Sequence, residues 1–231
     1  MLFVYNFKHK KSVEFIYKLI EHNFFIDVIV GANYINIKRP QKVISFSSFF
    51  DCNEHPMDVA NKFNIPYFEL NHNNEKIEDI IDEYSIDLGV IAGARILKDK
   101  IINLFDHGIV NFHPGILPEC RGLDSMFWSI YKDYPLGVTS HLINNKIDCG
   151  KLILKKKIQI LSNDNLFSIK KKIYNLQLDL IKLTLEKLIS DFELIDLDDS
   201  IVYNSYMPEL LQKEVIQKSE NYIKKFSCKN E

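Results

Sequence analysis

The chain has 231 residues, of which 46% are hydrophobic and 26% charged, and its formal net charge at pH 7 is −2. This length and composition are typical of one large α/β domain, or of one domain with a small appendage, and they are enough to bury a sizeable core. The slightly acidic balance argues against nucleic-acid binding, and no apolar run approaches the length of a membrane span.

The predicted elements alternate between strand and helix along most of the chain. The apolar run at 2–7 has no basic segment before it, so we interpret it as the first strand and not as a signal peptide. Helical spacing of apolar residues predicts a helix over 10–22, and Pro56 suits the first turn of a helix over 55–63. Short apolar runs predict further strands at 25–30, 43–47, 66–70, 88–92, 108–113, 136–143 and 152–154, and helices are predicted at 75–84, 98–105 and 124–132. This order predicts a mostly parallel sheet flanked by helices.

A long helix is predicted over 165–190, where large apolar residues form two stripes at spacings of three and four. Two stripes indicate two buried faces, one for the sheet and the other for the tail or a second subunit. The main domain is therefore expected to span 1–190, and 191–231 is a short appendage with a strand at 201–206 and a helix at 208–226. One stripe contains Leu166, Ile169, Ile173, Leu176, Leu180 and Leu183, and the other contains Leu178, Ile181, Leu185 and Leu188.

Four cysteines are spread along the chain without CxxC spacing: Cys52, Cys120, Cys149 and Cys228. This spacing indicates neither a zinc site nor a disulfide framework, so no metal is expected. Free cysteines are typical of a reducing cytoplasm, which is where we expect the protein.

The best candidates for catalytic residues lie at the ends of two predicted strands. Asn111 and His113 point to the same side of a strand that Pro114 ends. They lie at its carboxyl end, where open α/β sheets bind ligands. Asp148 lies in a constrained bend further on, with Gly150 beside it as a permissive residue. Taken singly, Asn111 could be a turn former, His113 a surface or core histidine, and Asp148 an acceptor for the local backbone. Together, in this order, the three residues favour a catalytic site.

At these residues the chain resembles the formyltransferases that use 10-formyltetrahydrofolate. The resemblance implies an α/β, Rossmann-like formyltransferase fold, with a central mostly parallel sheet flanked by helices and a small C-terminal appendage. The chain departs from the family pattern at Cys149 and Gly115, and these departures affect pocket shape without removing a catalytic group. The residues that carry the resemblance are Asn111, His113, Pro114, Leu117, Pro118, Arg121, Gly122, Gly137, Val138, Thr139, His141, Asp148 and Gly150.

The resemblance implies transfer of a formyl group from N10 of the folate to a primary amine. Asn111 would donate its amide N–H to the developing oxyanion. His113 would take a proton or stabilise that oxyanion as an imidazolium. Asp148 would orient the imidazole and raise its basicity, or pass a proton through water. This chemistry needs no metal.

Candidate binding residues flank the catalytic ones. In related enzymes the strand and turn that correspond to 88–97 wrap backbone around the pterin. This implies contacts with 10-formyltetrahydrofolate at Ala92, Gly93, Arg95, Ile96 and Leu97. Arg121 and Gly122 are candidates for substrate contact, and a structural ion pair is an equally weighted alternative for Arg121. Trp128 is interpreted as packing and not as a sugar-stacking residue.

The acceptor is inferred by elimination among related enzymes. The turn at 6–12 lacks the glycine with which glycinamide-ribonucleotide formyltransferases cradle a phosphate. The tail at 191–231 is too short for the additional domain of methionyl-tRNA formyltransferases. The folate-hydrolysing relatives carry a regulatory domain ahead of the catalytic one, and we expect none here. The chain therefore looks most like the sugar N-formyltransferases, which act on nucleotide-linked amino sugars such as dTDP-4-amino-4,6-dideoxyglucose for lipopolysaccharide and other surface glycans.

Three alternatives stay open: a glycinamide-ribonucleotide-type formyltransferase, a formyltetrahydrofolate hydrolase, and a non-catalytic folate- or nucleotide-binding module. No nucleic-acid or membrane partner is expected. A homodimer is expected at the level of the family.

Overall fold

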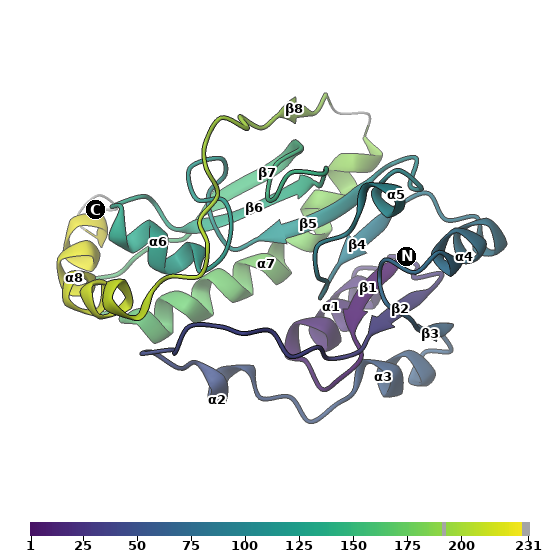
Figure 1. The fold of residues 1–231 in the computed structure, drawn as a ribbon, viewed down its shortest axis with the longest axis horizontal. Helices are drawn as coiled ribbons and strands as arrows, with labels where there is room; N and C mark the ends of the chain where they lie inside the picture. The colour runs from purple at the N-terminus through teal and green to yellow at the C-terminus, as the bar shows by residue number, and fades with distance from the viewer. Residues whose placement is uncertain (191–192, 228–231) are drawn as a thin grey trace. The chain divides into compact units, whose positions relative to one another are not determined.

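The structure is a computed structural model that describes residues 1–190 and 193–227; Cys228 lies outside the described residues. Its strands are β1 (Leu2–Tyr5), β2 (Ile29–Ala32), β3 (Tyr67–Glu69), β4 (Gly89–Ile91), β5 (Ile109–His113), β6 (Gly137–Leu142), β7 (Lys151–Lys157) and β8 (Ile195–Asp196). Its helices are α1 (Lys10–Glu21), α2 (Ser47–Phe50), α3 (Pro56–Lys62), α4 (Lys76–Tyr84), α5 (Asp99–Ile102), α6 (Ser125–Tyr131), α7 (Leu166–Ile189) and α8 (Glu209–Ser227) (Figure 1).

Over the described residues, eight strands form one sheet in the order β3-β2-β1-β4-β5-β6-β7-β8. The pairs β1–β2, β1–β4, β2–β3 and β4–β5 are parallel, whereas β7–β8 is antiparallel. The prediction of an α/β fold with a mostly parallel sheet flanked by helices is therefore confirmed.

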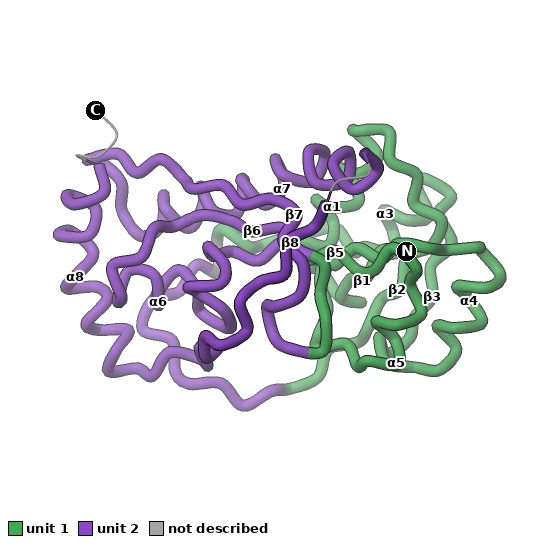
Figure 2. Tube along the Cα trace, turned by 90° about the horizontal axis from the view of Figure 1, so that it is seen from above, with its two compact units in different colours: residues 1–36, 47–111, 142–145 green, residues 37–46, 112–141, 146–231 purple. Residues whose placement is uncertain are grey.

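The described chain forms two compact units (Figure 2). The first contains residues 1–36, 47–111 and 142–145, and the second contains the described residues of 37–46, 112–141 and 146–231. The chain passes from the first unit to the second inside β5, between Asn111 and Phe112. The predicted boundary at residue 190 stays a prediction.

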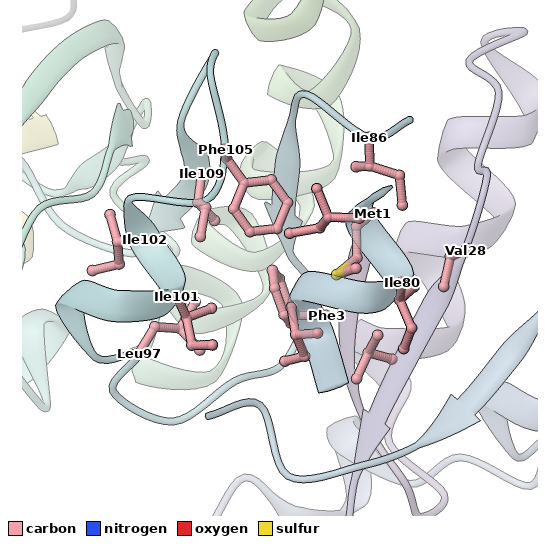
Figure 3. Packing of buried hydrophobic residues seen from close by; sticks show 13 residues of the cluster. Met1, Phe3, Val28, Ile80, Ile86, Leu97, Ile101, Ile102, Phe105 and Ile109 are labelled. Carbon is pink, nitrogen blue, oxygen red and sulfur yellow. The ribbon is translucent and has the colours of Figure 1, made fainter. Parts of the chain in front are cut away.

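The core of the first unit is built around β1 and β2 (Figure 3). The Phe3 ring is fully buried and meets the Phe105 ring edge-on, with 5.9 Å between the ring centroids. Helix α4 covers this cluster with Ile77, Ile80 and Ile81, which recur at helical spacing and are all buried. Burial of these side chains fixes β1 and β2 within the first unit.

In the second unit the long predicted helix is confirmed as α7. It begins at a capping box, in which the Asn165 side chain accepts from the Ser168 backbone N–H and the Ser168 hydroxyl accepts from the Asn165 N–H. The predicted stripes are largely buried, but Leu183 is 51% exposed, so its stripe ends one turn early. The predicted tail helix is confirmed as α8, where the Tyr222 hydroxyl donates to the Tyr134 carbonyl at 2.6 Å.

Four predicted elements were wrong in whole or in part. No strand begins at Phe25, because the end of α1 continues into a turn in which the Phe24 N–H bonds the Leu19 carbonyl, and Phe25 is 87% exposed. Residues 43–47 form no strand, since the Val43 N–H donates to the Gln212 side chain and not to a neighbouring strand. The helix predicted at 98–105 ends at Ile102, and 201–206 contributes only one isolated bridge, Gly122 with Asn204.

None of the helices in the described part of the chain combines the length and the hydropathy needed to cross a bilayer.

Candidate active site

His113 and Asp148 form a close, largely buried pair in the second unit. His113 is the last residue of β5, and Asp148 lies in the turn between β6 and β7. His113 Nδ1 is 3.3 Å from Asp148 Oδ1, and the two side chains are 4% and 16% exposed. A carboxylate at this distance from an imidazole, shielded from water, favours a proton held between them.

Asp148 is held in its ionised form by its neighbours. Its φ of 43° lies in the left-handed region, and the Gly122 N–H donates to Oδ2 at 2.8 Å. Burial raises the pKa of this carboxyl, but His113, His141 and the Gly122 N–H outweigh burial and lower it to about 2. Asp148 is therefore an anion at neutral pH.

The second ring nitrogen of His113 is oriented by the backbone. Nε2 lies 2.8 Å from the Cys120 carbonyl oxygen. Because a carbonyl only accepts, Nε2 must carry a hydrogen in this arrangement, which leaves Nδ1 to face Asp148. Gly115 makes room for the ring, since a Cβ there would lie 2.8 Å from His113 Nε2. The glycine at this departure from the family pattern thus has a steric role.

His141 is a functional candidate that the sequence interpretation did not place in the site. It is fully buried, its Nδ1 lies 2.8 Å from the Cys149 carbonyl, and its Nε2 lies 3.9 Å from Asp148 Oδ1. Both imidazoles thus direct one N–H at a carbonyl and the other nitrogen at the same carboxylate. An ionised Asp148 can face both only if it shares a proton with at least one of them. The signal in the sequence was the alternation along β6, which puts Thr139 and His141 on one face.

Asn111 lies in β5, half-buried, two residues before His113, in the stretch of the strand that belongs to the first unit. Its catalytic role stays a prediction.

The loop after β4 in the first unit contains the five predicted folate contacts. The N–H groups of Ala92 and Gly93 both bond the Phe3 carbonyl at 3.0 Å, and Leu97 is buried in the core cluster. Arg95 Nη2 donates to the Ile35 carbonyl at 3.0 Å, while its Nε is buried and has no hydrogen-bond partner among the described residues. Ile96 is 71% exposed. The predicted contacts of these five residues with the folate stay a prediction.

The two predicted substrate contacts, Arg121 and Gly122, have structural partners. Arg121 is 4% exposed, and its guanidinium donates to the backbone carbonyls of Ile147, Asp199 and Ile201 at 2.7–3.1 Å. These contacts favour the structural alternative, although the partners are carbonyls and not an ionic side chain. Trp128 is half-buried and donates to the Ser205 carbonyl at 2.9 Å.

Over the described residues, no group of three or more histidine, cysteine, aspartate or glutamate side chains could hold a metal ion. Cys52, Cys120 and Cys149 are free thiols.

The chain belongs to the formyl transferase family, whose pattern matches residues 24–185. This family takes its formyl group from 10-formyltetrahydrofolate. The match includes the loop after β4, both histidines and Asp148, and it ends inside α7.

Curated relatives are similar over part of their length. A methionyl-tRNA formyltransferase of Prochlorococcus marinus is 34% identical over 140 residues, which is 59% of this chain and 42% of that protein. One from Thermodesulfovibrio yellowstonii is 30% identical over 115 residues, or 49% of this chain and 36% of that protein. A phosphoribosylglycinamide formyltransferase of Haemophilus influenzae is 34% identical over 100 residues, or 41% and 47% of the two chains. The chain thus spans less than half the length of these relatives.

Solved structures share the fold over nearly the whole chain. A sugar N-formyltransferase from Shewanella sp FDAARGOS_354 has a TM-score of 0.65 at 21% identity and covers 94% of this chain and 86% of its own. The phosphoribosylglycinamide formyltransferase of Anaplasma phagocytophilum has a TM-score of 0.63 at 18% identity and covers 88% and 96%. At these identities the likeness establishes the fold alone.

Proposed function

We propose that this chain transfers a formyl group from 10-formyltetrahydrofolate to the primary amine of a nucleotide-linked amino sugar, with dTDP-4-amino-4,6-dideoxyglucose as the first acceptor to test. The observation that carries the chemistry is the buried His113–Asp148 pair, with 3.3 Å between Nδ1 and Oδ1. The product would be an N-formyl sugar for surface glycans.

The pair accounts for the movement of the proton. The amine attacks as its free base, and once the new C–N bond has formed its nitrogen must lose a proton. When the proton shared with Asp148 is on His141, Nδ1 of His113 carries a lone pair. His113 can then take the amine proton and return it to the folate nitrogen as the C–N bond to the donor breaks. His141, whose Nε2 also faces Asp148, compensates the negative charge of the carboxylate while the proton moves.

Asn111 is the proposed donor to the formyl oxygen, where negative charge develops during attack. A side-chain amide N–H supplies this stabilisation without giving up a proton. Strand alternation puts Asn111 on the same face of β5 as His113.

The proposed donor-binding loop suits a folate. Buried Arg95 Nε has an unused N–H among the described residues, and a pterin ring carries carbonyl and ring-nitrogen acceptors. Asn73 also fastens the loop, since it donates to the Ile96 carbonyl at 3.0 Å and accepts from the Lys98 N–H at 2.7 Å. When bound there, the folate would supply the formyl group.

One observation supports a sugar acceptor over glycinamide ribonucleotide. The first turn of α1 already has internal partners: His9 Nδ1 accepts from the Ser12 N–H at 3.2 Å, and the Ser12 hydroxyl accepts from the Tyr5 N–H at 3.2 Å. A phosphate would have to displace these bonds.

The curated relatives carry the names of methionyl-tRNA and phosphoribosylglycinamide formyltransferases, so their acceptors are the runners-up. A cytoplasmic location goes with the proposal, and the homodimer stays a prediction.

The deciding experiment is mass spectrometry of reactions that contain the protein, 10-formyltetrahydrofolate and one acceptor each. The panel is dTDP-linked 4-amino and 3-amino dideoxysugars, UDP-linked amino sugars, glycinamide ribonucleotide and methionyl-tRNA. A formyl-sized mass gain on a sugar nucleotide, absent with His113→Ala, is the expected result. Gain on glycinamide ribonucleotide or methionyl-tRNA alone would overturn the sugar assignment. Folate consumed without any formylated acceptor would indicate a hydrolase, and folate bound but untouched would indicate a binding module.

A further inference from the structure

The segment Leu197–Met207, hereafter the strap, links β8 to α8 and runs beside α6 (Figure 1). All of it lies in the second unit and beyond the residues matched by the family pattern. At one end the Leu197 N–H donates to the Gly150 carbonyl at 2.8 Å, and at the other the Met207 N–H donates to the Asp124 carboxylate at 2.9 Å. The strap is thus fastened at one end to the turn that carries Asp148 and at the other to the residue before α6.

Asn204 links the strap to residues 121–123 and to α6 and the residue after it. Its backbone N–H and its side-chain amide both donate to the Arg121 carbonyl, at 2.8 and 2.9 Å. Its carbonyl accepts from the Leu123 N–H at 2.8 Å, and its side-chain oxygen accepts from Lys132 at 2.7 Å. Asn204 therefore holds the residues on either side of Gly122.

Gly122 and Arg121 pass this constraint to Asp148. Gly122 donates its N–H to the Asp148 carboxylate, and it has a φ of 93° and no room for a side chain, since a Cβ would lie 2.1 Å from the Asn204 carbonyl oxygen. Arg121 joins the strap to the residue before Asp148: one edge of its guanidinium donates to the Ile147 carbonyl, and Nη1 donates to the carbonyls of Asp199 and Ile201.

Asp148 needs such support, because a non-glycine residue in the left-handed region is disfavoured unless its surroundings hold it there. We infer that the strap is part of the catalytic apparatus, with Asn204 and Arg121 as positioning residues that set the distance and protonation of the His113–Asp148 pair. This inference deepens the proposed function and rests on it for the catalytic readout.

The test is Asn204→Asp in the full chain. The variant keeps the shape of the side chain, an oxygen for Lys132 and the backbone N–H that donates to the Arg121 carbonyl, but it loses the side-chain N–H that donates to the same carbonyl. Without this bond Gly122 is held less firmly, and its N–H donates less well to the ionised carboxylate of Asp148. The ionised form is then less favoured, so the acid limb of the pH profile of kcat should move to higher pH. We expect kcat to fall about 10- to 100-fold with little change in KM, as for a displaced catalytic group.

Asn204→Ala is the second variant; it removes the same donor without adding a charge, so an effect common to both belongs to the lost bond to Arg121. Val202→Ala is the matched control, because Val202 lies in the same strap and is 82% exposed. It should keep the wild-type kcat and pH profile.

A readout that does not depend on turnover separates this inference from the proposed function. In protein with ¹⁵N-labelled histidine, the imidazole nitrogen signals of His113 report its tautomer and protonation. They should change in both Asn204 variants and not in Val202→Ala. Unchanged signals with an unchanged acid limb, or an equal loss in Val202→Ala, would overturn the inference. If wild type formylates no acceptor, the proposed function fails, and the histidine signals still decide the role of the strap.

Discussion

At the scale of single residues, His113 is the side chain whose loss the proposed chemistry tolerates least. His113→Ala removes the group that takes and returns the proton, so we predict a fall in turnover of about 10²–10⁴-fold. His107→Ala is the matched control, because His107 also faces an aspartate but has a side chain that is 70% exposed. Steady-state kinetics with the acceptor identified by mass spectrometry would check this. Wild-type turnover in a folded His113→Ala protein would exclude His113 as the acid–base group.

Asp148 makes a second prediction at this scale, on stability against pH. Lowering its pKa from 3.8 to about 2 stabilises the folded state by about 2 kcal/mol. Because the folded-state pKa is the lower one, this contribution is complete above 3.8 and is lost as the pH falls through about 2. Asn tolerates the same backbone conformation as Asp, so Asp148→Asn should lower the unfolding free energy at neutral pH mainly through the lost charge. Near pH 3 the difference in unfolding free energy between wild type and variant should be roughly half as large as at neutral pH.

Urea unfolding of both proteins at the two pH values measures that difference. Asp87→Asn is the control, since the Asp87 side chain is 64% exposed. A difference that stays the same at both pH values would mean that the carboxylate charge does not stabilise the fold.

The sequence predicts part of the site for a physical reason that applies to single residues. Strand alternation and the proline that ends β5 are local, so they identify His113 and its place. The bend at Asp148 is also local, and Gly150 has the positive φ, 97°, that the prediction of a bend there requires. The fastening of Arg121 to Ile147, Asp199 and Ile201 joins residues far apart in the chain, and no periodicity encodes such contacts.

At the scale of elements, α7 depends on its first turn. Asn165 accepts from the backbone N–H groups of Phe167 and Ser168, both at 2.9 Å, which otherwise lack helical partners. Asn165→Ala should lower the unfolding free energy by about 1 kcal/mol, whereas Asn165→Asp should keep most of it. Urea unfolding checks this, with Asn163→Ala, an exposed residue of the preceding turn, as the control. Equal stability of Asn165→Ala and wild type would show that the cap contributes nothing.

Helices with strong periodicity and most buried strands were predicted well, whereas two short extended segments at 43–47 and 201–206 were not. Lys10–Glu21 and Leu166–Ile189 match their predicted ranges within a residue or so, because apolar spacing over many residues averages out local exceptions. The segments 43–47 and 201–206 have strand-like composition, but a strand also needs a neighbour with free backbone groups. The Val43 N–H donates to the Gln212 side chain instead, and Asn204 forms a single isolated bridge with Gly122. Only tertiary contacts decide such cases.

At the scale of the whole molecule, the question is whether the tail shares the folding of the residues before it. The family pattern ends at residue 185, and the sequence alone favoured an appendage from 191. Yet the tail helix α8 buries Val215, Tyr222 and Ile223 in the second unit, and Tyr222 bonds the Tyr134 carbonyl. Buried contacts of this kind are typical of an element that unfolds together with its surroundings.

Tyr222→Ala tests that cooperativity. Deleting a fully buried aromatic ring should lower the unfolding free energy by about 3–5 kcal/mol. If α8 unfolds with the rest of the second unit, the main urea transition should move to lower urea concentration with its slope unchanged. Fluorescence of Trp128, which lies in α6 and donates to the Ser205 carbonyl of the strap, follows this transition. Ile216→Ala, at a position 40% exposed on the same helix, should shift the midpoint far less. An unmoved Trp128 transition, with helical signal lost earlier, would mean that the tail is an independent appendage and that the strap is held only as firmly as its own hydrogen bonds allow.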